Sequence, residues 1–213
     1  MEYEKTIKDA EELAKILIKK KARKTIGIYY FAWGFYFLYG TLISAILYNL
    51  NVTNVLADSL PFFAFLIPLY YTYKMIRDIN WEFIVQRYRI ENLEKARKRY
   101  NTEFAISYAV SMLLAILIFL VIIPLSTNEI VKLGAVSLFI IFILYWLYKA
   151  LYSADRLVDP RYYDLLVVVS FPFFAPEMVG LAPPIMSFSI SMLIAMAWLY
   201  GGFRSILEVS EIE

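Results

Sequence analysis

The sequence predicts an all-α, polytopic integral membrane protein, with about six transmembrane helices in three hairpins preceded by an amphipathic amino-terminal helix. Three observations predict this class. The 213 residues are 61% hydrophobic, and the mean hydropathy is +0.60, values that are high for a soluble domain. The charged residues are gathered into a few blocks. The long runs between them lack the polar stripe that faces water on a soluble helix, so their solvent must be lipid.

The first predicted element is a cytoplasmic amphipathic helix over residues 1–24. Its apolar residues recur every third or fourth position, as they do on one helix face, and they are Tyr3, Ile7, Ala10, Ala14 and Leu17. Charges run through the whole segment, so we expect no signal peptide here. The pattern is compatible with packing on a partner and with lying on the inner leaflet, and we favour the leaflet.

Residues 25–213 form the predicted transmembrane domain. A hydrocarbon layer of about 30 Å needs about 20 apolar helical residues, and four windows satisfy this clearly. A further apolar run from Leu165 to Phe203 is too long for one helix and is interrupted by APEMVGLAPP, whose prolines break helices. We expect two spans there, the first unusually short. The predicted spans are residues 25–50, 55–73, 104–124, 133–150, 163–176 and 185–203.

Basic residues predict the orientation of these spans, because Lys and Arg favour the cytoplasmic side. With the amino terminus inside, all of the 21 Lys and Arg residues except Lys132 fall in inner segments. Many Tyr and Trp residues gather at the same span ends, as expected for the headgroup zone. We therefore expect a plasma-membrane protein with both termini in the cytoplasm. The tetrapeptide KARK, which occurs at 21–24 and 95–98, marks this boundary or a duplicated unit.

The largest predicted soluble piece is the cytoplasmic helical loop 74–103. Its apolar face is interpreted either as a docking surface for a cytosolic protein or as a connector that rests on lipid; the face consists of Trp81, Ile84, Val85 and Tyr88. Basic residues of the loop alternate with Glu91 and Glu94. The loop therefore does not indicate a nucleic-acid partner, and the expected partners are the lipid bilayer and other protein subunits.

Within the predicted spans no ionisable residue lies at mid-depth, which argues against proton relays and charge-binding transport sites. Spans three and six each carry a small residue at every fourth position. Such stripes favour close packing of helices over a pore lining. The stripes are Ser107, Ser111 and Ala115 in span three, and Ser187, Ser191 and Ala195 in span six.

The chain contains no cysteine and no histidine. Thiolate nucleophiles, disulfides, imidazole bases and the usual zinc, haem and iron-sulfur ligands are therefore excluded. We predict no catalytic residue, no cofactor and a protein that is not an enzyme. The single glutamine, Gln86, together with abundant Ile, Tyr, Lys and Glu, is a thermophile-like composition.

One carboxylate pair remains, in the string SADRLVDPRYYD. Asp155 and Asp159 stand four residues apart, so on a helix they share a face at the inner surface, where Mg²⁺ would suit them. They are also explained as helix-end charges and an Asp-Pro turn. On Asp155, Arg156 and Asp159 the string resembles part of the aspartate-rich motif of UbiA-type intramembrane prenyltransferases, which implies magnesium held against a diphosphate. The upstream Asn and Asp of that motif have no counterpart, since residues 151–153 are Leu, Tyr and Ser.

The overall layout is similar to the membrane subunit of polysaccharide- and drug-exporting ABC systems. The similarity lies in the amphipathic first helix, the six spans, the helical loop after span two and the proline-rich interruption between spans five and six. It implies that the loop contacts an ATPase and that residues 171–184 re-enter from outside. We predict an integral membrane subunit or accessory or assembly protein of a larger complex. The alternatives are the permease subunit of an ABC-type exporter and a Mg-dependent prenyltransferase-like enzyme.

Overall fold

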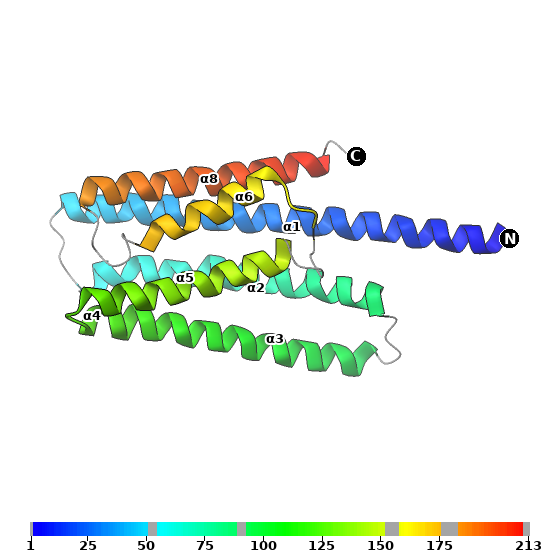
Figure 1. The fold of residues 1–213 in the computed structure, drawn as a ribbon, viewed down its shortest axis with the longest axis horizontal. Helices are drawn as coiled ribbons and strands as arrows, with labels where there is room; N and C mark the ends of the chain where they lie inside the picture. Colours follow the sequence, from blue (N-terminus) through cyan, green and yellow to red (C-terminus); the bar gives the residue numbers. More distant parts are fainter. Residues whose placement is uncertain (1, 51–54, 89–92, 152–157, 176–182, 211–213) are drawn as a thin grey trace.

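The computed structural model describes residues 2–50, 55–88, 93–151, 158–175 and 183–210, and these residues form helices and no strands. The predicted all-α class is confirmed. The helices run lengthwise beside one another and alternate in direction (Figure 1). They are α1 (Glu2–Asn49), α2 (Val55–Tyr88), α3 (Leu93–Ile116), α4 (Ile123–Leu125), α5 (Glu129–Leu151), α6 (Tyr162–Ser170) and α8 (Pro184–Ser210), with a π-helical segment at Leu117–Ile122 and a 3₁₀ turn at Phe171–Phe174.

The first helix differs from the prediction, because α1 is one uninterrupted helix of 48 residues. The expected boundary after residue 24, between a surface-lying helix and the first span, is absent. The physical reason is local: no Gly or Pro precedes Gly27, and the Lys, Ala and Arg of KARK are good helix formers. The amino-terminal part of α1 therefore continues along the axis of its apolar part and projects past the other helices (Figure 1).

The predicted helical loop at residues 74–103 consists mostly of the end of one helix and the start of the next. Helix α2 continues to Tyr88 and α3 begins at Leu93, so only residues 89–92, which lie outside the described part, separate them. The end of α2 and the start of α3 lie side by side at the same end of the bundle as the projecting part of α1 (Figure 1).

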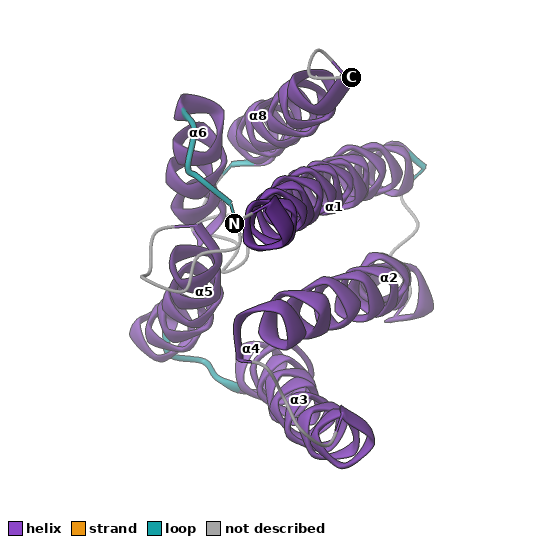
Figure 2. Ribbon diagram, turned by 90° about the vertical axis from the view of Figure 1, so that its right-hand side faces the viewer, coloured by secondary structure: helices purple, strands orange, loops and turns teal. Residues whose placement is uncertain are grey.

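Helix α1 occupies the centre of the arrangement, with α8 and α6 on one side of it and α2 on the other (Figure 2). It packs against α8 and α2, while α6 packs on α8 and α3 packs on α2. The core between α1, α6 and α8 is aromatic. Trp198 lies edge-on to Tyr30 and Phe37, with ring centroids 5.8 and 5.7 Å apart. Such edge-to-face pairs stabilise a core beyond the area that they bury.

Helices α1 and α8 approach each other closely at two glycines. A Cβ atom built on Gly202 of α8 would lie 2.9 Å from the backbone oxygen of Gly27 on α1. That contact is with backbone, which a rotamer change cannot relieve. Only glycine permits this separation of the two helices.

Two predicted spans contain irregular turns, and both are associated with proline. In the third, Pro124 follows the π-helical segment Leu117–Ile122; proline lacks the N–H that an α-helix would use at that point. In the fifth, α6 passes into the 3₁₀ turn that contains Pro172. Residues Tyr162–Phe174 therefore rise only about 20 Å at 1.5 Å per residue, less than a hydrocarbon layer of about 30 Å.

By length and composition, two helices in the described part of the chain could cross a membrane, Glu12–Leu47 and Ile185–Ser210. Tyr162–Phe174 is a shorter apolar helix. These helices are weak evidence for a membrane protein, and the six-span arrangement goes beyond them. It is taken up below as a proposal.

Candidate functional site

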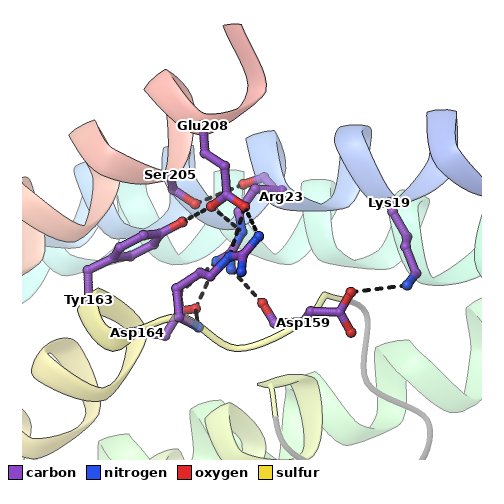
Figure 3. Close-up of polar contacts among 8 residues, drawn as sticks. Lys19, Arg23, Asp159, Tyr163, Asp164, Ser205 and Glu208 are labelled. Atoms are coloured by element: carbon purple, nitrogen blue, oxygen red, sulfur yellow. Dashed lines mark hydrogen bonds and ion pairs between the residues drawn. The ribbon is translucent and has the colours of Figure 1, made fainter. Parts of the chain in front are cut away.

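The most developed polar site is a buried ionic cluster where α1, α6 and α8 meet (Figure 3). We define the cluster as Arg23, Tyr30, Arg161, Tyr163, Asp164 and Glu208. Its centre is Asp164, at the third position of α6, whose Oδ2 accepts a 2.7 Å hydrogen bond from the backbone N–H of Arg161. The carboxylate thus caps the helix that carries it, as acidic side chains at helix starts commonly do.

Arg23 of α1 is the partner of this carboxylate. Its Nη1 donates to both oxygens of Asp164 at 2.9 Å, and its Nη2 donates to the backbone oxygen of Asp159 at 2.6 Å. The Tyr30 hydroxyl, two turns along α1, adds a 2.8 Å hydrogen bond to Asp164. The side chains of Arg23 and Asp164 are only 6% and 0% exposed, so the ion pair is enclosed by protein.

Helix α8 closes the cluster through Glu208. The carboxylate accepts from Nε and Nη2 of Arg161 at 2.9 and 2.6 Å and from the Tyr163 hydroxyl, and it lies 3.6 Å from Nε of Arg23. The guanidinium of Arg23 also stands 5.1 Å from the centre of the Tyr163 ring, within cation–π distance. Each of the three helices therefore contributes at least one charged group.

The charges of the cluster balance, with two guanidinium groups facing two carboxylates. The hydrogen bond to Glu208 raises the pKa of the Arg161 guanidinium above its ordinary value. Burying an ion pair has a large desolvation cost, which only good geometry and further hydrogen bonds offset. Apart from the cap within α6, these bonds join the start of α6 and the residues just before it to α1 and α8, so the arrangement can hold the start of α6 against those two helices. Within the described residues no group of three or more potential metal ligands forms.

The two aspartates of the predicted magnesium site do not form a described site. Asp155 lies outside the described residues. Asp159 is exposed, and its Oδ2 forms a 3.1 Å ion pair with Nζ of Lys19 on α1. The carboxylate of Asp159 is therefore paired with Lys19, while its backbone oxygen accepts a hydrogen bond from the buried Arg23.

The predicted docking face at the end of α2 has a partner inside the chain. The Trp81 ring lies 5.5 Å from the ring of Tyr100 on α3, and Ile84 and Val85 are half-buried. The side chain of Tyr88 lies outside the described part. Desolvation in this contact raises the pKa of Tyr100 to about 12 from the ordinary 10.0. Binding of a separate protein by this face stays a prediction.

The small-residue stripes occupy different depths in the bundle. Ser191 and Ala195 on α8 and Ala115 on α3 are buried, whereas Ser107, Ser111 and Ser187 are half-buried. A close backbone approach between α1 and α8 lies further along, at Gly202, which sequence reasoning did not single out.

Sequence reasoning also passed over the ionic cluster. In the sequence, Arg23 is one of several basic residues at a predicted boundary, and Asp164 ends the string SADRLVDPRYYD, in which Asp155 and Asp159 form the predicted pair. A usable signal was present, because Asp164 directly precedes the apolar run LLVVVS and therefore begins a buried helix with a carboxylate. Its partner could not be identified, since Arg23 lies 141 residues away.

Comparison with known proteins finds no match to this chain among family models, curated proteins or solved structures.

Proposed function

We propose that the chain is a multi-pass plasma-membrane protein that acts, without enzymatic activity, as a subunit or accessory factor of a larger membrane assembly. The observation that carries the membrane part is the chemistry of the outward faces. Helices α3, α5 and α8 expose large apolar residues at spacings of three and four, so each presents a continuous apolar stripe away from the bundle. These stripes are Ile106, Val110, Leu113 and Leu117; Leu138, Ile141, Tyr145 and Tyr148; and Leu193, Met196, Tyr200 and Phe203.

Contiguous apolar patches of this extent are unusual on soluble monomers, whereas they suit a bilayer. Two of the three stripes lie on α3 and α5, which extends the argument beyond the two longest apolar helices. The direction of the helices supports the proposed orientation. The cation-rich segments, which are the start of α1, the end of α2 and the start of α3, meet at one end of the bundle (Figure 1). Lys132 lies near the start of α5, at the other end.

Arginine substitution tests the proposal directly. Leu113, Ile141 and Leu193 are 65%, 62% and 67% exposed and lie near the middle of three predicted spans. In a membrane, Leu113→Arg, Ile141→Arg and Leu193→Arg should each oppose insertion by about 2.5–3.5 kcal/mol. On a soluble surface the same changes should cost less than about 0.5 kcal/mol. The matched control is Leu17→Arg, 56% exposed on the projecting part of α1.

The wild-type protein should stay in membranes after alkaline carbonate extraction. The other spans would anchor a variant with one defective span, so the readout for the variants is the yield of folded protein from that membrane fraction. A lower yield of the three mid-span variants, with Leu17→Arg at the wild-type level, is the expected result. Equal yields of all four variants would contradict the six-span arrangement.

The subunit part of the proposal is supported by the projecting end of the molecule. Beyond the bundle, α1 exposes three large apolar residues, Leu13, Ile16 and Leu17. Exposed apolar residues outside the predicted spans favour contact with another protein. Purification in a mild detergent tests this: co-purification of a membrane complex is expected, and loss of that complex in Leu17→Arg would identify the contact.

The permease alternative is favoured by one observation, the shortness of α6. The apolar segment Tyr162–Phe174 rises about 20 Å and changes to a 3₁₀ turn at Pro172, as a short helix that turns back inside the bilayer could. Residues 176–182 of the proposed re-entrant segment lie outside the described part. Recovery of a nucleotide-binding subunit in the same purification would favour the exporter reading over the accessory reading.

A further inference from the structure

A hollow of about 370 Å³ lies between α1, α2 and α3 near the projecting end of the bundle. Its polar lining comes from all three helices and consists of Lys21, Thr25, Asp78, Trp81, Glu82 and Arg97. The volume is within the range of small-molecule sites, which start at about 300 Å³. The hollow does not overlap the ionic cluster, whose residues lie on α1, α6 and α8.

The carboxylates around the hollow are each paired with a cation, and one further cation, Arg97, is not part of these pairs. Nζ of Lys21 forms an ion pair with Oε1 of Glu82, and Arg77 forms one with Asp78 at 3.0 Å. Within the described residues no ion pair joins a carboxylate to Arg97. The four charged residues that line the hollow sum to zero, and the pairing of Asp78 with Arg77 outside the lining brings the site to a net charge of +1, with Arg97 as the guanidinium outside the two ion pairs. Such a group prefers a singly charged oxyanion, which it can bind through two parallel N–H bonds.

The depth of the hollow points to the source of that anion. Lys21 precedes the first predicted span by four residues, Asp78 follows the second by five, and Arg97 precedes the third by seven. At 1.5 Å per residue, Lys21 and Asp78 lie about 6–8 Å outside the hydrocarbon layer, and Arg97 lies about 10 Å outside it. The headgroup layer occupies roughly the first 5–8 Å on each side of the bilayer, so Lys21 and Asp78 fall within it and Arg97 lies just beyond its outer edge. Trp81, whose ring is fixed against Tyr100, adds the amphipathic wall typical of that layer.

We propose that this hollow binds the phosphate of an anionic phospholipid headgroup, with Arg97 as the main ligand and Lys21 and Trp81 as its walls. The inference rests on the proposed membrane location. The bound lipid would connect α1 to the α2–α3 hairpin at the cytoplasmic surface. This is the end at which α1 projects and at which a partner subunit is proposed to bind.

Titration of the detergent-solubilised protein tests the site. The probes are short-chain dihexanoyl phosphatidylglycerol, dihexanoyl phosphatidylcholine and inorganic phosphate, and the readout is tryptophan fluorescence. We expect a saturable change with phosphatidylglycerol, weaker binding of phosphatidylcholine because its headgroup carries no net charge, and no binding of inorganic phosphate at the same concentration. Trp81→Phe should abolish the signal, because Trp81 lines the hollow. A signal that persists in that variant places the lipid elsewhere and overturns the proposal.

Substitution of three charged residues should leave folding intact and should change the affinity for phosphatidylglycerol in different ways. Arg97→Gln should weaken phosphatidylglycerol binding about tenfold or more, since a charge-assisted hydrogen bond is lost. Lys98→Gln is the matched control, because Lys98 is the next residue on α3 and does not line this hollow. Glu82→Gln should strengthen binding, because it releases Lys21 from its ion pair.

Equal affinities of Arg97→Gln and Lys98→Gln would refute the assignment of the ligand. Inorganic phosphate that binds as tightly as phosphatidylglycerol would show a site for a soluble anion and overturn the lipid assignment. The carbonate extraction described above keeps the two proposals separate. A protein that is retained in membranes but binds none of the probes overturns this inference alone, whereas a protein absent from membranes overturns the proposed function.

Discussion

The ionic cluster predicts a large and non-additive effect when the buried pair of Arg23 and Asp164 is broken. Asp164→Leu leaves Arg23 charged in a place where its side chain is only 6% exposed. Arg23→Met leaves Asp164 with the hydrogen bonds from Tyr30 and from the Arg161 backbone but without a full counter-charge. Removing one member of a buried ion pair typically costs about 3–5 kcal/mol. For a chain of this length that cost corresponds to a fall in Tm of about 6–20 °C.

The double variant Arg23→Met/Asp164→Leu is the informative one. It removes both charges of the buried pair, and its main remaining costs are the Tyr30 hydroxyl and the Arg161 backbone N–H, which have both lost their acceptor, at about 1–3 kcal/mol each. The double variant should therefore be no less stable than either single variant, which amounts to a coupling energy of about 3 kcal/mol. The assay is thermal or denaturant-induced unfolding of the detergent-solubilised protein, followed by circular dichroism at 222 nm.

The control for this cycle is Lys19→Gln, which removes the exposed ion pair with Asp159. The side chains of Lys19 and Asp159 are both at least half exposed, so loss of this ion pair should lower the free energy of unfolding by less than about 1 kcal/mol. Single-variant losses that add within about 0.5 kcal/mol in the double variant would show that the two residues act independently. Single-variant losses no larger than that of Lys19→Gln would show that the cluster does not hold the three helices together.

Further predictions concern helix contacts, topology and pH. Gly202→Ala should destabilise the protein by about 1–3 kcal/mol, because its Cβ would meet the Gly27 backbone. A Cβ at Gly40 meets no atom within 4 Å, so Gly40→Ala should stabilise the protein by about 0.5–1 kcal/mol. If both variants change the free energy of unfolding in the same direction, the close contact is contradicted. The chain lacks cysteine, so single cysteines can be introduced without removing others. A membrane-impermeant thiol reagent on intact cells should label Thr127→Cys but not Lys20→Cys or Lys98→Cys. Labelling of all three variants would disprove the orientation. The pKa of Tyr100 is raised, so its folded phenol holds its proton more tightly than the unfolded one, and this stabilisation is complete below pH 10 and lost as the pH rises towards about 12. Tyr100→Phe should flatten the fall in stability over that window, and an unchanged fall would show that Tyr100 does not titrate as described.

Much of the architecture was accessible from the sequence, because it depends on local composition. Apolar runs separated by charged blocks predict helices whatever surrounds them, and the expected starts of the second and last predicted spans agree with α2 and α8 to within a residue. The end of the predicted proline-rich interruption agrees with the start of α8 at Pro184, while residues 176–182 of that interruption lie outside the described part. Helix α1 continues through the predicted boundary after residue 24 for a local reason too, because charge changes there but helix propensity does not.

The tertiary structure alone decided which charged residues matter. Lys19, Arg23 and Lys24 are similar in sequence terms, yet only Arg23 is buried, because α6 and α8 cover it from positions more than 130 residues away. The same holds for Asp159, which stays exposed, and Asp164, which does not. Periodicity along a chain shows which face of a helix is apolar. It contains no information about which distant helix will lie against a given charge, and that pairing determines whether the charge is solvated or held in an ion pair.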